Sequence, residues 1–194
     1  RSIVPYDEAL IKALEDKAQG IRRAVVEMIA GAGSGHPGGG LSAVEILTVL
    51  YFHVLRVDPS RPTWEERDRF VLSKGHGSAA WYATLAARGY FPAEHFRRFR
   101  QTGGMLQGHP DMRKVPGVDM SSGSLGQGLS VAQDLGRPGR AGRGSHAAEQ
   151  HGPAHPQLAA GVDKALVTVQ DRSTRGGAGR LVKQEFGHNR AHVQ

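Results

Sequence analysis

The order of hydrophobic and polar residues in the first part of the chain predicts two helices. Between residues 6 and 30, apolar side chains recur at intervals of three and four and so share one helix face; they are Leu10, Leu14, Ala18, Ile21, Val25 and Met28. Gly31 and Gly33 end this helix. Residues 46–55 are almost continuously apolar, too long for a typical strand, and predict a buried helix. Ser42 and Glu45 have the spacing of a capping box at its start.

The next hydrophobic segment predicts a strand. Residues 69–73 are short, apolar and followed by Gly75, as is typical of a buried parallel strand. His76 lies just beyond the carboxyl end of this strand, where open α/β sheets bind their ligands. Residues 78–87 predict another helix, ended by Gly89, and Pro92 starts a short one. These elements indicate an α/β fold.

The hydrophobic period stops after Ala132. Residues 133–144 alternate glycine, arginine and polar residues, and Phe186 is the only aromatic residue from 133 to the last residue. Only residues 158–169 are apolar enough for a short helix or strand. We therefore divide the chain into a family-like domain, 1–132, and a tail, 133–194, whose composition predicts disorder.

Composition narrows the setting of the protein. The 194 residues include no cysteine, which excludes disulfides and zinc–thiolate sites. No apolar run of membrane-spanning length and no signal-like start are present, so we expect a cytoplasmic protein without a membrane partner. The net charge of +7 could attract phosphorylated sugars or nucleic acid, and it is also typical of an ordinary solvated surface. Irregular spacing argues against a metal site among the histidines of the tail, which are His146, His151, His155, His188 and His192.

Three histidines stand in glycine-rich loops between apolar segments. His36 lies within residues 33–40, His76 within 72–77 and His109 within 107–111, and each follows a glycine. A glycine-rich stretch, 120–129, then runs into an apolar segment, as in a loop that enters a helix beside a ligand. Each histidine alone is better explained as a loop residue that hydrogen-bonds the backbone. Together, they predict one shared cleft with residues 123–125 at its wall.

Four of these motifs, in this order, resemble the pyrophosphate-side domain of transketolase. They are Ser-Gly-His-Pro-Gly-Gly, Ser-Lys-Gly-His, Gln-Gly-His-Pro-Asp-Met and Gly-Ser-Leu-Gly-Gln-Gly. The likeness runs from about residue 10 to residue 132 and is greatest for transketolases split into N- and C-terminal subunits. It implies an incomplete thiamine-diphosphate-binding fold, with a mostly parallel sheet flanked by helices. It also implies transfer of a two-carbon ketol unit from a ketose phosphate to an aldose phosphate.

The resemblance also implies roles for single residues. His36 corresponds to the position that serves proton transfer near the reacting sugar carbons, and His109 to the one that contacts the donor's hydroxyls. Imidazole suits such work because its pKa lies near working pH. His76 corresponds to a contact of the cofactor phosphate and the substrate. The family's backbone contacts to the aminopyrimidine correspond to Gly123, Ser124 and Leu125, although Leu125 equally fits an ordinary core position.

The resemblance ends inside a predicted helix. The family continues with a Gly-Asp-Gly-Glu turn and a later asparagine, which hold the Mg²⁺ that bridges to the diphosphate, and neither occurs after Ala132. We therefore expect no metal ligands in this chain and little or no transketolase activity from the chain alone. Residues after Ala132 are interpreted as non-native, following a truncation or frameshift, with a genuine disordered extension as the alternative.

Partners and alternatives follow from the same resemblance. The family implies sugar-phosphate substrates and a C-terminal transketolase subunit or a homodimer partner. Deoxyxylulose-phosphate synthase shares cofactor and fold, but the Gly-His-Pro and Ser-Lys-Gly-His motifs fit transketolase better. The other alternative is a non-catalytic remnant that binds a partner subunit or, through its basic tail, nucleic acid, which is otherwise not an expected partner.

Overall fold

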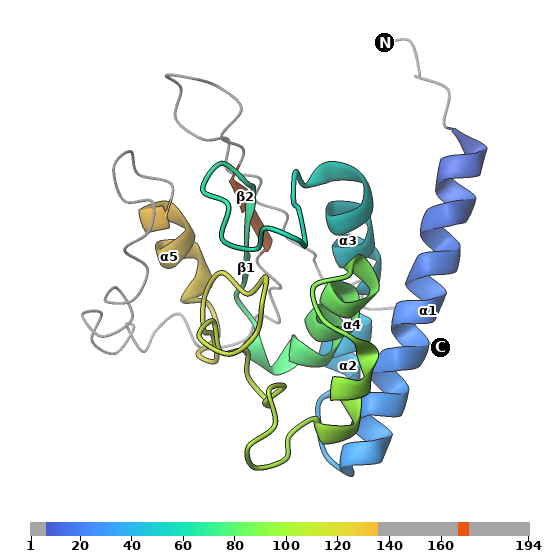
Figure 1. The fold of residues 1–194 in the computed structure, drawn as a ribbon, viewed down its shortest axis with the longest axis vertical. Coiled ribbons are helices and arrows are strands. Elements are labelled where there is room, and N and C mark those ends of the chain that lie inside the picture. Colours follow the sequence, from blue (N-terminus) through green and yellow to red (C-terminus); the bar gives the residue numbers. More distant parts are fainter. Residues whose placement is uncertain (1–6, 136–166, 171–194) are drawn as a thin grey trace, which may run out of the picture.

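The computed structural model describes residues 7–135 and 167–170 (Figure 1). The predictions of disorder and of non-native sequence for residues 133–194 therefore lie outside the described residues, apart from 133–135 and 167–170. Within the described part, helices lie on both sides of a short strand, β1, as Figure 1 shows. No helix in these residues is long and apolar enough to cross a membrane.

The first predicted helix is confirmed. Helix α1 spans Glu8–Ala32 and buries Ala18, Ile21, Val25 and Met28 on the face that the sequence predicts. The carboxylate of Asp7 caps its start, accepting hydrogen bonds from the backbone N–H groups of Ala9 and Leu10 at 3.0 and 3.2 Å. Gly33 ends it with a φ of 61°, a conformation that favours glycine.

The second apolar stretch is helical, but its predicted capping box is wrong. Helix α2 spans Pro37–Leu41 and α3 spans Val44–Val49, followed by a π-helical turn, Leu50–Val54. Ala43 is the N-cap of α3 and provides no side-chain hydrogen bond. The Ser42 hydroxyl instead accepts a hydrogen bond from the Lys74 ammonium at 2.8 Å, and Glu45 forms an ion pair with Arg22. Long-range partners have replaced the local cap.

The sheet differs from the expected one. Strand β1, Arg69–Leu72, pairs with β2, Val167–Gln170, in antiparallel register from Arg69–Gln170 to Leu72–Val167. The expected mostly parallel sheet is therefore not what the described residues form. A parallel neighbour of β1 would need a second strand after a crossover, whereas the described residues from 73 to 135 form helices and loops.

The layering nevertheless has the α/β character that the sequence indicates. Phe70 and Leu72 of β1 face the main core, which includes residues of α1, α3 and α4. Val71 faces the other way and packs with Met120, and with Val131 of α5, which spans Gly128–Leu135. The strand is thus buried on both faces, as expected for the interior of an α/β layer structure.

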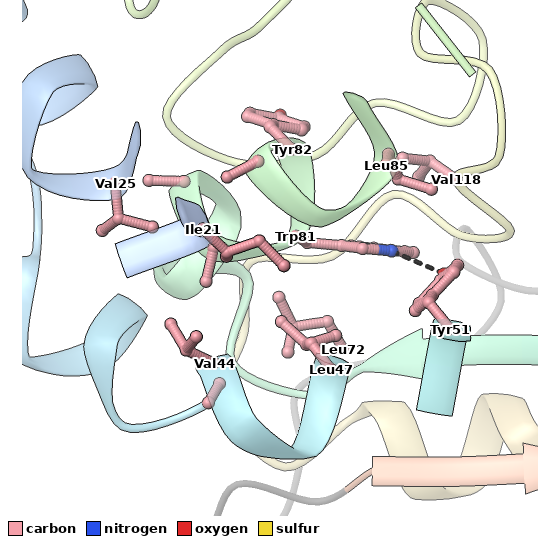
Figure 2. Packing of buried hydrophobic residues seen from close by; sticks show 14 of the residues in the cluster. Ile21, Val25, Val44, Leu47, Tyr51, Leu72, Trp81, Tyr82, Leu85 and Val118 are labelled. Atoms are coloured by element: carbon pink, nitrogen blue, oxygen red, sulfur yellow. Dashed lines mark hydrogen bonds between the residues drawn. The ribbon is translucent and has the colours of Figure 1, made fainter. Parts of the chain in front are cut away.

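Helix α4 is the centre of the main core. It spans Ser78–Arg88, follows a 3₁₀ turn at Gly75–Gly77, and ends at Gly89, as the sequence predicts. Trp81 is fully buried, and its indole N–H donates to the Tyr51 hydroxyl at 2.7 Å (Figure 2). The Phe70 ring meets Trp81 edge-on at 5.1 Å, so strand and helix are joined by aromatic packing. A second 3₁₀ segment, Ala93–Arg98, covers one end of this layer.

A buried carboxylate joins the start of β1 to the segment before α5. Asp119 accepts hydrogen bonds from Arg67 at 2.5 and 3.1 Å and from Arg69 at 3.1 Å. It also accepts the backbone N–H of Phe70 at 2.9 Å. The side chains of Asp119 and Arg67 are only 2% and 5% exposed. Two guanidinium groups thus share one carboxylate, and the buried Asp119 and Arg67 side chains have the multiple hydrogen bonds that buried charges require.

Replacing Asp119 by alanine should therefore destabilise the fold strongly. The loss leaves the buried Arg67 guanidinium without a counter-charge, which costs about 3–5 kcal/mol in the free energy of unfolding. Urea unfolding measures it. The matched control is Asp16→Ala, which removes the exposed partner of Lys12 in α1 and should cost about 0.5 kcal/mol or less. Equal losses in the two variants would contradict the assignment.

Candidate functional site

The candidate site is built at the carboxyl end of β1. Ser73 directly follows the strand, and its hydroxyl accepts the backbone N–H of Gly128 at 3.1 Å, while its carbonyl accepts that of Gly126 at 3.3 Å. The start of α5 is thereby attached to the end of the strand. A Cβ on Gly128 would lie 2.6 Å from the Ser73 Cβ, so this close approach requires glycine. The loop that precedes α5 is held where α/β folds bind ligands.

His36 and His76 lie side by side. Their ring centroids are 5.2 Å apart in an edge-on arrangement. His36 immediately precedes α2, and His76 stands in the 3₁₀ turn before α4. Gly39 of α2 packs directly on His76, because a Cβ there would lie 2.8 Å from the imidazole Cδ2. The absence of a side chain at Gly39 therefore makes room for the His76 ring.

His109 reaches the same region from a third loop. Its ring lies against Gly123, where a Cβ would be 3.7 Å from the imidazole. Residues 122–123 in turn contact the 3₁₀ turn of His76, because a Cβ on Gly75 would overlap the Ser122 carbonyl group. The three histidine loops and residues 122–123 thus form one continuous set of contacts. Their predicted roles stay predictions.

Residues 123–125 present backbone and side chains to the outside. Gly123, Ser124 and Leu125 are all exposed, and Leu125 is 65% exposed. The alternative of an ordinary core position for Leu125 is therefore wrong. Within the described residues, the backbone N–H groups of these three residues make no hydrogen bond. This short segment offers unused donors and an apolar side chain to a ligand.

Two further side chains in this region were not predicted from the sequence. Lys74 is 5% exposed and donates to Ser42, so that it joins the end of β1 to the residue after α2. The Ser122 hydroxyl is buried and has no hydrogen-bond partner among the described residues. The signal that could have identified Lys74 is its position directly before Gly75 and His76 in the sequence. Nothing in the sequence signals the burial of Ser122.

The region carries no metal cluster that the described residues could form: no group of three histidine, cysteine, aspartate or glutamate side chains is brought together there. Glycine backbones and imidazoles can instead receive a flat ring and a diphosphate. Two glycines, Gly39 and Gly75, are in contact with neighbours that a Cβ would overlap. The exposed segment 123–125, whose backbone N–H groups bond no other described residue, is the part that fits the organic rings of thiamine diphosphate.

Asp111 stabilises the turn that follows His109. Burial raises the pKa of Asp111, but hydrogen bonds from the backbone and side chain of Arg113, with the charges of Arg113 and Lys114, outweigh burial and bring the pKa below its ordinary value. Its carboxylate also accepts a hydrogen bond from the Ser121 hydroxyl at 3.4 Å. Because Ser121 precedes the 122–125 segment, this carboxylate joins the two loops.

Comparison with known proteins adds independent information. Residues 14–155 match the family model described as transketolase, thiamine diphosphate binding domain. The chain is 51% identical over 119 residues to the 6-deoxy-6-sulfo-D-fructose transketolase subunit SqwG of Clostridium sp. (strain MSTE9), covering 61% of this chain and 43% of that protein. It is 45% identical over 131 residues to an apulose-4-phosphate transketolase subunit of Actinobacillus succinogenes, covering 67% of this chain and 46% of that protein.

Solved structures give the same result. The transketolase from Leishmania mexicana matches with a TM-score of 0.61 and 38% identity, over 63% of this chain and 18% of that one. The transketolase from Campylobacter jejuni matches with a TM-score of 0.60 and 37% identity, over 64% and 20%. The chain thus spans less than half the length of the curated relatives it matches.

The contact between Gly75 and Ser122 leads to a stability prediction. Gly75→Ala forces the Ser122 backbone away and should lower the free energy of unfolding by about 1–3 kcal/mol, as overpacking does. Gly38→Ala is the matched control. Gly38 lies in α2 with nothing within 4 Å of its would-be Cβ, so alanine should be neutral or stabilise by up to about 1 kcal/mol. Urea unfolding compares the variants, and an equal effect would refute the packing described.

The lowered pKa of Asp111 leads to a pH prediction. A carboxylate with a lowered folded-state pKa contributes stability that is fully present above its unfolded pKa, ordinarily 3.8, and lost as the pH falls through the folded value. The unmodified chain should therefore exceed Asp111→Asn in unfolding free energy at about pH 6, well above that value, and the difference should shrink below the ordinary pKa. Denaturation of both proteins across this range tests it. A difference that grows on acidification would contradict the prediction.

Proposed function

The chain belongs to the transketolase thiamine diphosphate-binding domain family, and we propose that it is the cofactor-side part of a split transketolase. The observation that carries this proposal is the gathering of the three histidine loops and residues 122–123 at the carboxyl end of β1. The similarity to transketolase subunits supports it. The reaction is transfer of a two-carbon ketol unit from a ketose phosphate to an aldose phosphate.

Thiamine diphosphate supplies an electron sink for the carbon–carbon bond that breaks. The protein's own groups hold and orient it. The backbone N–H groups of Gly123, Ser124 and Leu125 would hold the aminopyrimidine, and the exposed Leu125 side chain would offer it an apolar contact. His76, half-buried between Gly39 and the end of β1, donates to a phosphate oxygen. Such a charge-assisted hydrogen bond is stronger than a neutral one.

The other two histidines serve the sugar. His36 is exposed at the edge of His76 and moves a proton at the reacting carbons' oxygen atoms, for which an imidazole is suited at neutral pH. His109 is exposed against Gly123 and binds a hydroxyl of the donor. The substrates are sugars with a terminal anionic group. Two relatives, a 6-deoxy-6-sulfo-D-fructose transketolase subunit and an apulose-4-phosphate transketolase subunit, support this class.

A partner and a metal ion complete the proposal. The partner is a C-terminal transketolase subunit, or a second copy in a homodimer, whose surface closes over the outward-facing residues 123–125. Mg²⁺ is the expected counter-ion of the diphosphate, although the family's ligand turn does not occur in this sequence. The parallel sheet of the complete domain belongs to the same proposal. Alone, the chain binds thiamine diphosphate weakly and does not convert the sugar phosphates.

Cofactor titration tests the proposal. Thiamine diphosphate with Mg²⁺, added to the full chain, should quench tryptophan fluorescence with saturation, and His76→Ala should weaken binding about tenfold, the equivalent of about 1.4 kcal/mol for one charged hydrogen bond. The control is His53→Ala, an exposed histidine of the π-helical turn. No turnover of xylulose 5-phosphate with ribose 5-phosphate is expected from the chain alone. Absence of saturable binding, with and without a C-terminal subunit, would refute the proposal.

A further inference from the structure

We propose that the hydroxyls of Ser78 and Tyr82 are positioning groups that hold residues 107–108 on α4 and thereby fix His109 beside the His76 turn. The role of His109 rests on the proposed function. The placement of His109 rests on contacts within the chain, so the two can fail separately. Ser78 and Tyr82 are both fully buried. Both act through the backbone of the histidine loop.

Ser78 links two histidine loops directly. It is the first residue of α4, lies two residues after His76 and is fully buried. Its hydroxyl donates to the Gly108 carbonyl at 2.8 Å, and Gly108 immediately precedes His109. The distance between the His76 turn and the His109 loop is therefore set by one short hydrogen bond.

Tyr82 adds a second attachment one helical turn later. It lies on the same face of α4 as Ser78, since residues i and i+4 share a face. Its hydroxyl donates to the Gln107 carbonyl at 3.0 Å, and its ring packs edge-on against Phe99 at 6.2 Å. Burial raises the pKa of the Tyr82 hydroxyl, followed by the charge of Asp111, so the group stays a donor throughout the physiological range.

The rest of this loop is held by hydrogen bonds within the loop and by Leu106, which is fully buried in the main core. The Gln107 amide donates to the carbonyls of Gln101 and Gly104 at 3.0 and 2.7 Å, and the Arg100 backbone N–H donates to the Leu106 carbonyl at 2.8 Å. Among the described residues, the hydrogen bonds between residues 100–109 and α4 are those of Ser78 and Tyr82. The two hydroxyls therefore supply the directional contacts of this loop with the helix, beside the apolar packing of Leu106.

The other side of His109 shows what the attachment achieves. Its ring lies against Gly123, and the Ser122 backbone N–H donates to the Pro110 carbonyl at 3.3 Å. With the two hydroxyls in place, the 107–110 segment is held between α4 and the 122–123 loop. Loss of the hydroxyls frees one side, and the ring can then move away from Gly123.

Four single variants of the full chain separate positioning from general stability. Tyr82→Phe and Ser78→Ala delete the two hydroxyls. The matched controls are Tyr51→Phe, whose buried hydroxyl accepts from Trp81, and Thr84→Val, whose buried hydroxyl donates within α4 to the Ala80 carbonyl. Each control deletes the same chemical group from the same core without touching residues 107–108. Ser78→Thr, which keeps the hydroxyl, serves as the rescue.

The readouts report on the loop rather than on activity. Hydrogen exchange of the Ser122 amide should be roughly fivefold faster in Tyr82→Phe and in Ser78→Ala, the ratio equivalent to about 1 kcal/mol for one net hydrogen bond. The ¹⁵N chemical shifts of the His109 imidazole, assigned with His109→Gln, should change in the same two variants. Those of His36 should not. The controls should lower the unfolding temperature but leave both readouts unchanged, and Ser78→Thr should restore them.

Unchanged His109 shifts in Tyr82→Phe and Ser78→Ala would overturn the inference, as would equal changes in Tyr51→Phe and Thr84→Val. Thiamine diphosphate titration of the unmodified chain is read separately. If the cofactor does not bind while His109 still responds to the two hydroxyls, the positioning stands and the proposed function fails. If the cofactor binds while His109 does not respond, the proposed function stands and the positioning fails.

Discussion

The carboxylate of Asp119 is the interaction on which the candidate site depends. It accepts hydrogen bonds from Arg67 and Arg69 at the start of β1 and from the Phe70 backbone N–H. The carboxylate is buried, so water does not compete for these hydrogen bonds. At the other end of the strand, Ser73 receives the backbone N–H groups of Gly126 and Gly128. Residues 119–128 therefore run alongside β1 in the same direction, attached at both ends. Between the attachments, Met120 packs on Val71.

This double attachment explains why the glycines stand where they do. A segment held so close to a strand end leaves no space for side chains at the points of contact, and a Cβ at Gly75 or Gly128 would overlap its neighbour. The same closeness puts the backbone of residues 122–123 against the His76 turn and the His109 ring. Packing of the strand thus determines the placement of two histidines that lie 33 positions apart in the sequence.

Local patterns in the sequence predicted the elements, and long-range contacts explain what they missed. Helix α1 followed from its periodicity and β1 from a short apolar run before Gly75, because each signal is contained in neighbouring residues. The capping box at Ser42 failed because Lys74, 32 residues away, binds its hydroxyl. The antiparallel partner of β1 and the exposure of Leu125 depend on what packs there in three dimensions. The glycine–histidine pairs did indicate which loops meet.

The residues of the candidate site face outward, and this bears on how it would work. His36 and His109 are exposed, and residues 123–125 have unused backbone donors beside a largely exposed leucine. Hydrogen bonds from such groups to a ligand are weak while water competes for them, and they strengthen when a covering surface excludes water. The matched part of the chain covers less than half of each transketolase subunit that it resembles. Under the proposed function, the described residues supply one face of the site, and tight binding would depend on a second face that covers it.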